Sequence, residues 1–223
     1  MSRKTLAEGI GTGLLLYVIV GSGIAAESLG SDRAVQLLAH ALVVGLALAV
    51  LIALFQTTSG SHFNPSVTLA FWTTRQVGRR TAFGYFLAQV LGGIAGVALA
   101  NVTFDLPALA VSTTARNGFG QMAAEAVATF VLVLVILGLV RSGREAAVPA
   151  AVGAWVAAIV FATSSTGFAN PAVTIARTLT DSYTGIAPAS VAGFLVAQLL
   201  AGLGAALIAP LFDPETEPRT ATT

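Results

Sequence analysis

The chain has 223 residues, of which 56% are hydrophobic and only 9% are charged, and its formal net charge is +1. Soluble domains carry about 25% charged residues, so this composition, with a mean hydropathy of +0.85, indicates a membrane protein with several spans. The near-neutral charge argues against a nucleic-acid partner. The absence of cysteine excludes disulfides, thiol catalysis and thiolate metal sites.

Long apolar runs, most of them about 20 residues, predict six transmembrane helices. In chain order they lie at 6–26, 34–55, 82–102, 122–140, 148–162 and 187–211. The first follows a short basic segment, but it continues past signal-peptide length without a clear cleavage site and is therefore interpreted as a span. The polar tail at 212–223 is expected to be disordered.

One seven-residue phrase occurs twice. It is written Asn64-Pro65-Ser66-Val67-Thr68-Leu69-Ala70 and then Asn170-Pro171-Ala172-Val173-Thr174-Ile175-Ala176. Asparagine is a good N-cap, and proline suits the first helical position, where its missing N–H has no partner to lose. Each phrase therefore predicts a helix start. The first apolar segment ends near Thr73 and the second near Asp181. Neither is long enough to cross a hydrocarbon core of about 30 Å.

The repeat extends beyond this phrase. Ala7-Glu8-Gly9 corresponds to Ala124-Glu125-Ala126, and the segment with Gln89 corresponds to the segment with Gln198. Each half then contains two spans, a half-helix and a third span, so the halves have opposite orientations. We therefore predict an all-α membrane protein with six transmembrane helices and two re-entrant half-helices in an inverted repeat. A single domain covers 1–223, with repeat one at about 5–103 and repeat two at about 119–211.

The inverted repeat makes the two half-helices enter from opposite faces and meet near the midplane. Irregular backbone at that depth is tolerated only where it is buried in protein or lines a wet cavity. The first three residues of each repeated phrase, 64–66 and 170–172, are called the two boxes below. Six residues that precede them are expected to offer carbonyl groups to a hydrogen-bonding solute: Gly60, Ser61, His62, Thr166, Gly167 and Phe168. The two positive helix ends would oppose cations.

Six spans place both termini on one side. Eight basic residues fall on that side and three on the other, which predicts cytoplasmic termini.

These features resemble the aquaporin, or major intrinsic protein, family, and the resemblance covers residues 5–211. It implies one pore per chain, a homotetramer, and passive flow of water or small neutral solutes across the lipid bilayer, without a cofactor or metal. The paired motifs are Asn64, Pro65, Ser66 and Asn170, Pro171, Ala172, with Ser66 in place of the usual alanine. Glu8, Glu125, Gln89 and Gln198 match residues that hold the pore loops.

The resemblance also places an outer selectivity filter at four positions: Val44, Ala158 (or its neighbour Ala157), Gly167 and Val173. Water-selective members have an arginine where this chain has Val173. The small apolar set implies a wider, arginine-free opening. Together with the segments 104–107, 112–114 and 176–181, it resembles the bacterial aquaporins of arsenic-resistance operons, which implies passage of arsenite and methylated arsenicals across the inner membrane.

Several residues carry two interpretations. Asn64 and Asn170 are either ordinary N-caps or pore-lining donors. Glu8 and Glu125 are either loop anchors or a proton relay. His62 and His40 either face the pore or pack between helices. Arg177 either restores the cation exclusion lost at Val173 or pairs with Asp181 at i+4.

The preferred interpretation is a passive channel for small uncharged solutes, not an enzyme. The rival is a proton-coupled secondary transporter that uses Glu8 or Glu125, since inverted repeats and broken helices occur there too. A third possibility is a non-conducting scaffolding relative.

Overall fold

The computed structural model describes residues 2–212, in which every regular element is a helix. Six of its helices are long and apolar enough to cross a membrane, as the sequence predicts. They are α1 (Arg3–Leu29), α2 (Arg33–Ser59), α4 (Arg79–Thr103), α5 (Phe119–Arg141), α6 (Val148–Ala162) and α8 (Val191–Ile208). Short 3-10 turns extend α6 and α8: η1 (Glu145–Ala147), η3 (Pro188–Ser190) and η4 (Ala209–Phe212). Of the predicted tail, residues 213–223 lie outside the described range.

The helices run a few residues beyond most of the predicted spans because polar caps set their ends. The Ser2 hydroxyl accepts a hydrogen bond from the Thr5 N–H at the start of α1. The Asp32 carboxylate accepts from the N–H groups of Ala34 and Val35 at the start of α2. A hydropathy pattern locates only the apolar middle of such helices, whereas capping bonds satisfy the free backbone groups at the ends.

Two short helices begin at the repeated phrase, as predicted. They are α3 (Pro65–Thr73), with nine residues, and α7 (Pro171–Ala176), with six. Asn64 and Asn170 are their N-caps, and a proline follows each cap. The second half-helix is shorter than predicted, because after Ala176 the chain tightens into the 3-10 turn η2 (Arg177–Leu179) and stops short of Asp181.

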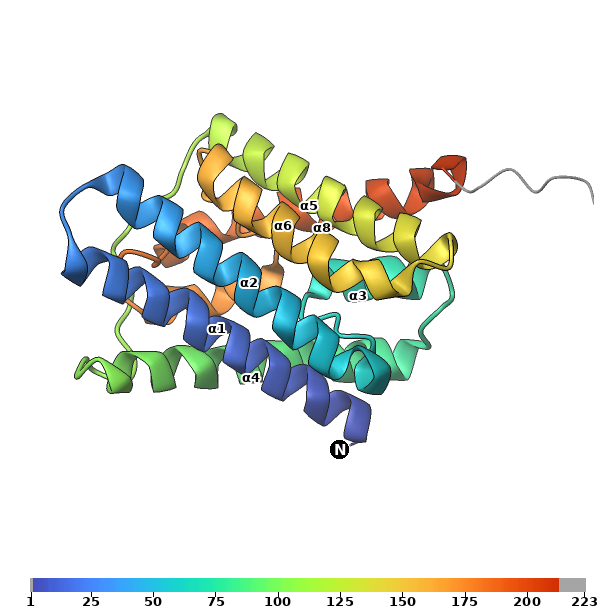
Figure 1. The fold of residues 1–223 in the computed structure, drawn as a ribbon, viewed down its shortest axis with the longest axis horizontal. Coiled ribbons are helices and arrows are strands. Elements are labelled where there is room, and N and C mark those ends of the chain that lie inside the picture. The colour runs from blue at the N-terminus through green and yellow to red at the C-terminus, as the bar shows by residue number, and fades with distance from the viewer. Residues whose placement is uncertain (1, 213–223) are drawn as a thin grey trace, which may run out of the picture.

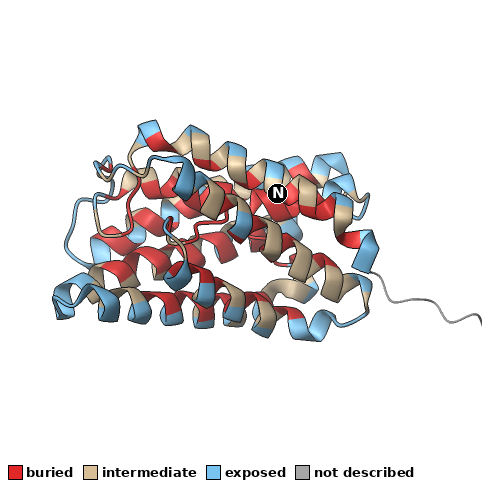
Figure 2. Cartoon of the chain, turned by 90° about the horizontal axis from the view of Figure 1, so that it is seen from above, coloured by how far each residue is buried: buried red, intermediate tan, exposed pale blue. Residues whose placement is uncertain are grey.

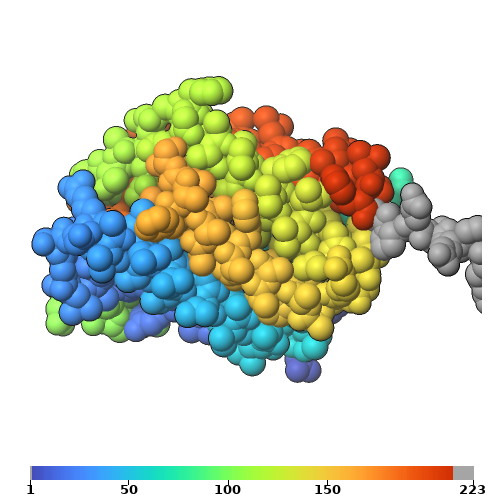
Figure 3. Space-filling view, turned by 45° about the horizontal axis from the view of Figure 1, so that its top comes forward, coloured from blue at the N-terminus to red at the C-terminus, as the bar shows by residue number. Residues whose placement is uncertain are grey.

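The packing of the helices repeats between the two halves (Figure 1). In the first half α1 packs against α2 and α4, and in the second half α5 packs against α6 and α8. Each half-helix crosses over, since α3 packs on α8 and α7 packs on α4. Helix α6 lies against α2 and crosses the surface between α2 and α5 (Figure 3). The start of α1 and the end of η4 lie at the same end of the bundle, called the terminal end below (Figure 1).

Burial follows the pattern of a membrane bundle. Buried residues face the interior, whereas the outer faces of the helices and the connections at the ends of the bundle, such as 27–33 and 104–109, are exposed (Figure 2). Large apolar side chains such as Leu46, Leu54 and Leu207 are exposed on those outer faces. Apolar side chains facing outward are stable in hydrocarbon, so the bundle is a multi-pass membrane protein.

Candidate functional site

A cavity of about 60 Å³ lies at the centre of the bundle. Its walls come from α1, α2, α5 and α6, and from the two loops that precede the half-helices. Most wall side chains are apolar, including Leu15, Leu48 and Val160. Polar groups enter from the loops, from Asn64 and Asn170, and from His40 and Arg177. A mainly apolar wall with a few placed polar groups is typical of a site for small uncharged molecules.

The first loop is held by the carboxylate of Glu8, which is completely buried. Its Oε1 accepts from the His62 N–H at 2.9 Å and the Ser59 hydroxyl at 2.6 Å. Its Oε2 accepts from the Phe63 N–H at 2.7 Å and the Gln89 amide at 2.8 Å. Four donors satisfy the buried charge, which is the condition for keeping such a charge in the bundle.

The second loop is held in the same way by Glu125, which is also completely buried. Its carboxylate accepts from the N–H groups of Phe168 and Ala169, both at 2.8 Å. The Gln198 amide donates to the same carboxylate at 2.6 Å. The structure thus brings each predicted glutamate and glutamine together beneath a loop, on repeat-related helices.

Both loops adopt left-handed backbone at corresponding positions. Counted back from the following asparagine, positive φ angles occur at the fourth residue (Gly60, 89°, and Thr166, 61°), the third (Ser61, 50°, and Gly167, 53°) and the first (Phe63, 47°, and Ala169, 49°). Such conformations are costly for residues with a side chain and persist only where the surroundings enforce them. The carboxylate bonds to the N–H groups of Phe63 and Ala169 supply that constraint.

The two boxes are joined by a reciprocal pair of hydrogen bonds. The Asn64 Nδ2 donates to the Ala169 carbonyl at 2.7 Å, and the Asn170 Nδ2 donates to the Phe63 carbonyl at 2.8 Å. Their Oδ1 atoms accept from the N–H groups of Ser66 and Ala172, so both residues are also N-caps. Each amide nitrogen carries two hydrogens, and one remains for a molecule in the cavity.

Three of the four predicted filter residues, Val44, Gly167 and Val173, line the cavity. Ala158 does not, because its side chain is exposed on the outer face of α6. Ala157 also turns away, since it packs against Gly45 of α2. The α6 residues in the wall are instead Val152, Val156 and Val160, spaced by one helical turn. Counting residues along the sequence from the two boxes therefore did not identify the face of α6 that lines the cavity.

The loop residues divide similarly. Ser61, His62, Thr166, Gly167 and Phe168 line the cavity, whereas Gly60 is not part of its wall. Gly60 instead forms the left-handed C-cap of α2, with a φ of 89°. The walls also include Phe63 and Ala169, which the sequence pattern did not single out. Their carbonyls are the acceptors of the cross-loop bonds, so only the fold identifies them.

Both histidines line the cavity while packing against other groups. The His62 Nδ1 lies 3.1 Å from the Thr68 hydroxyl, and its ring contacts Phe71 and Tyr85. The His40 Nδ1 lies 2.8 Å from the Ser22 hydroxyl, and its ring meets Tyr183 edge-on. For both residues, facing the cavity and packing between helices are therefore compatible.

Arg177 is 3% exposed and also lines the cavity. Its Nε donates to the Thr184 carbonyl, and its guanidinium lies 3.5 Å from the centre of the Phe168 ring. Asp181 lies with the loop instead, where its Oδ1 accepts from the Thr113 N–H and hydroxyl. The structure thus favours the cavity-facing interpretation of Arg177 over the pair with Asp181.

A second arginine, Arg116, holds this region together from the loop before α5. Its Nε donates to the Gly185 carbonyl at 2.8 Å, and its guanidinium lies 5.0 Å from the Phe168 ring centre. Burial lowers the pKa of Arg116 from its usual value, and the nearby Glu125 opposes that shift. The sequence offered no signal for this role, because the contacts come from distant segments.

Ser66, the departure in the first box, points away from the wall and into the helix packing. Its hydroxyl donates to the Gln198 carbonyl at 3.2 Å, and Gly202 packs beside it.

Among residues 2–212, no three His, Cys, Asp or Glu side chains gather as metal ligands would.

Two opposed half-helices, capped by paired asparagines around a central cavity in a six-helix membrane bundle, define a membrane channel. The family described as "Major intrinsic protein" matches residues 1–169. The chain is 44% identical over 228 aligned residues to "Aquaglyceroporin AqpS" of Rhizobium meliloti (strain 1021), with 99% of this chain and 97% of that protein covered. It is 33% identical to "Aquaporin PIP2-7" of Arabidopsis thaliana, over 84% of this chain and 66% of that protein.

Among solved structures, the aquaglyceroporin from Plasmodium falciparum superposes with a TM-score of 0.76 over 96% of both chains, at 22% identity, which shows a shared fold. The chain therefore belongs to the major intrinsic protein family, and it is a channel rather than an enzyme.

Proposed function

We propose that the chain is a passive channel for small uncharged solutes: water, glycerol-like molecules, and metalloid acids such as arsenite and methylated arsenicals. It acts in a bacterial inner membrane as a homotetramer with both termini in the cytoplasm. The observation that carries this proposal is the central cavity, which combines the free amide hydrogens of Asn64 and Asn170 with the apolar Val173 at the position after the second box.

Neutral solutes suit this cavity because the polar groups can replace only part of a hydration shell. A hydroxylated molecule exchanges water for the amide hydrogens of Asn64 and Asn170 and for nearby carbonyls. An ion would lose its shell against mainly apolar walls, at a cost of order tens of kcal/mol for an isolated charge in a dry interior. The positive ends of α3 and α7 add a barrier to cations.

The absence of an arginine at position 173 favours solutes larger than water. Val173 is 2% exposed and lies in the wall, in the first turn of α7. A valine neither projects far into the cavity nor supplies donors to water. The name of the relative covering nearly the whole chain, an aquaglyceroporin, supports this width.

The rival transporter has less support. A proton relay needs a carboxylate that exchanges protons with the pathway, but Glu8 is 0% exposed and accepts from four donors. Protonating it would break the bonds that shape the loop. The transporter therefore remains an outcome of the test rather than a second proposal.

Permeability of reconstituted vesicles tests the proposal. We expect wild-type vesicles to pass water, glycerol and As(OH)₃ faster than lipid alone, without saturation and without a pH gradient. Val173→Arg should slow glycerol and As(OH)₃ more than water, and Val173→Leu separates added charge from added bulk. Uptake that saturates and requires a pH gradient would establish the transporter, and permeability equal to lipid alone would establish a non-conducting relative.

A further inference from the structure

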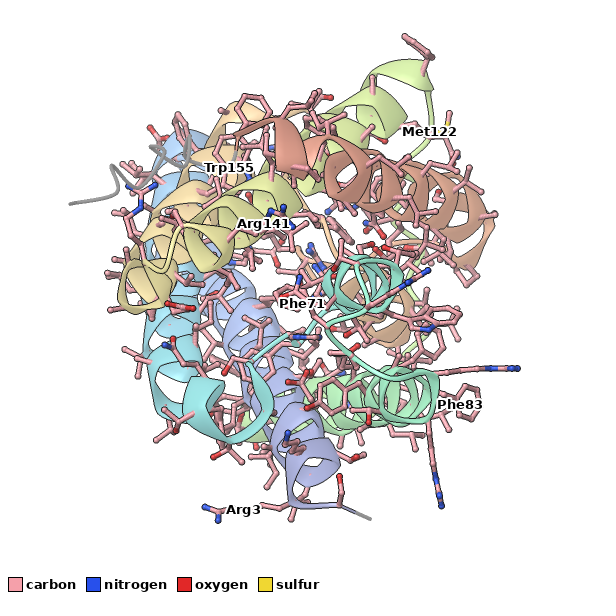
Figure 4. All side chains as sticks on the ribbon, turned by 90° about the vertical axis from the view of Figure 1, so that its right-hand side faces the viewer. Arg3, Phe71, Phe83, Met122, Arg141 and Trp155 are labelled. Carbon is pink, nitrogen blue, oxygen red and sulfur yellow. The ribbon has the colours of Figure 1, made fainter. Side chains whose placement is uncertain are left out.

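A cluster of aromatic rings in tilted and edge-to-face contact packs around the loop at the terminal end of the cavity. The His62 ring lies 4.6 Å from the Phe71 ring and 5.4 Å from the Tyr85 ring, between centroids. Phe71 follows Asn64 by seven residues, on the half-helix α3. Seen from the terminal end, Phe71 lies near the middle of the bundle, whereas Phe83 and Arg3 lie at its periphery (Figure 4).

The opposite end has the corresponding cluster, in which all three members differ and one of them is charged. Phe168 occupies the place of His62, and its ring lies 5.3 Å from that of Phe194, which corresponds to Tyr85. Arg177 follows Asn170 by seven residues, as Phe71 follows Asn64, and its guanidinium lies 3.5 Å from the Phe168 ring centre. The inverted repeat therefore places a positive charge where its partner half has a central aromatic ring.

The surroundings of Arg177 fix its position. Its Nε donates to the Thr184 carbonyl, and its own carbonyl accepts from the Ile186 N–H at 3.3 Å. The next carbonyl, that of Thr178, accepts from the Ser112 N–H at 2.9 Å. A guanidinium stacked on an aromatic ring and bonded at Nε has little freedom to swing away.

The rest of the guanidinium is available to the cavity. Among the described residues, no side chain or carbonyl accepts a hydrogen bond from its two terminal nitrogens, and Arg177 belongs to the cavity wall. His40 belongs to the same wall and uses its Nδ1 on the Ser22 hydroxyl. Arginine keeps its charge in proteins, so this charge faces whatever enters the cavity.

We propose that Arg177, which is stacked on Phe168 and lines the cavity together with His40, supplies the fixed side-chain charge that excludes cations from this pore. It lies one helical turn beyond Val173, at the end of the cavity away from the termini. The proposal rests on the proposed channel function. It makes the opening wide at Val173 and charged at Arg177, so that width and charge selection are separated along the pore.

Removing the charge tests this assignment. Vesicles with Arg177→Met should show sodium and proton permeability roughly tenfold or more above the wild type, because a nearby fixed charge in a medium of low dielectric repels cations strongly. Water and glycerol flux should persist. Arg80→Met, at an exposed arginine at the start of α4, is the matched control and should leave ion leak at the wild-type level.

A second comparison protects the test against misfolding, since Arg177 is buried. Arg177→Gln keeps a planar donor for the Thr184 carbonyl without the charge, and should leak as Arg177→Met does. Arg177→Lys keeps the charge and should exclude cations. In the double variant Val173→Arg with Arg177→Met, the returned charge should restore cation exclusion.

The outcomes separate the two proposals. Wild-type vesicles without solute permeability would overturn the channel itself. Wild-type vesicles that conduct solutes, combined with an unchanged ion leak in folded Arg177→Met or Arg177→Gln, would overturn the role of Arg177 and leave the channel intact.

Discussion

Glu8 and Glu125 are ionisable groups inside a membrane bundle, and such groups usually indicate a proton or ion pathway. Their contacts indicate a structural role here. Each carboxylate receives the N–H groups of two consecutive loop residues and the amide of a glutamine on the neighbouring helix. The charge fixes the direction of all these bonds, because a carboxylate accepts hydrogen bonds and cannot donate them.

Glu8→Gln should destabilise the protein by about 2–3 kcal/mol, because a neutral amide accepts fewer bonds and turns a donor toward the loop N–H groups. The expected readout is a lower unfolding midpoint in detergent, together with slower water flux. Glu27→Gln, at an exposed glutamate near the end of α1, is the control for loss of one negative charge. An unchanged midpoint with abolished pH-driven uptake would instead favour a proton relay.

At this scale the sequence predicted the residues that meet by repeat symmetry. The sequence did not predict which side of a helix faces the cavity where the local residues show no difference between one face and another. The segment around Ala158 is apolar on every side, so polarity does not indicate which side faces the cavity, and the structure turns Val156 and Val160 inward. The contact of Arg177 with Phe168 likewise depends on how η2 folds back.

At the scale of elements, α1 and α4 approach so closely that their glycines touch backbone to backbone. A Cβ atom at Gly92 would overlap the carbonyl oxygen of Gly9, and one at Gly96 would overlap that of Gly13. Small residues at such contacts let membrane helices pack through van der Waals contact, where no hydrophobic effect draws them together.

Gly92→Ala should therefore separate α1 from α4 and cost about 1–3 kcal/mol, as overpacking of a tight interface does. Gly138→Ala is the matched control, because the space around Gly138 in α5 is open within 4 Å. That change should be neutral or stabilise by roughly 0.5–1 kcal/mol, through helix propensity alone. Equal unfolding midpoints for the two variants would contradict the close contact.

The positions of the helices along the chain were the most predictable part of the structure. Hydropathy located all six spans, and the Asn-Pro phrase located both half-helix starts. The end of the second half-helix was not predictable, because the turn η2 is held by Ser112 and Ile186 from other segments.

At the scale of the whole molecule, the proposed orientation places the α1–α2 loop outside the cell and the α5–α6 loop inside. The chain lacks cysteine, so a single introduced thiol is labelled without background. Ser31 and Ala146 are exposed residues in these two loops. In intact cells an impermeant thiol reagent should label Ser31→Cys, and it should label Ala146→Cys only after permeabilisation. The opposite pattern would invert the proposed orientation.

The reciprocal bonds that Asn64 and Asn170 each donate to the opposite loop have a consequence for biogenesis. Asn64 donates to Ala169, which lies 105 residues further along the chain, so the first pore loop lacks its partner while the ribosome is still synthesising the second half. The translocon must therefore hold or tolerate an unfinished re-entrant loop until most of the chain has been inserted. The glutamate of each half can hold its own loop, but the pair of bonds between the loops forms only when both halves are present.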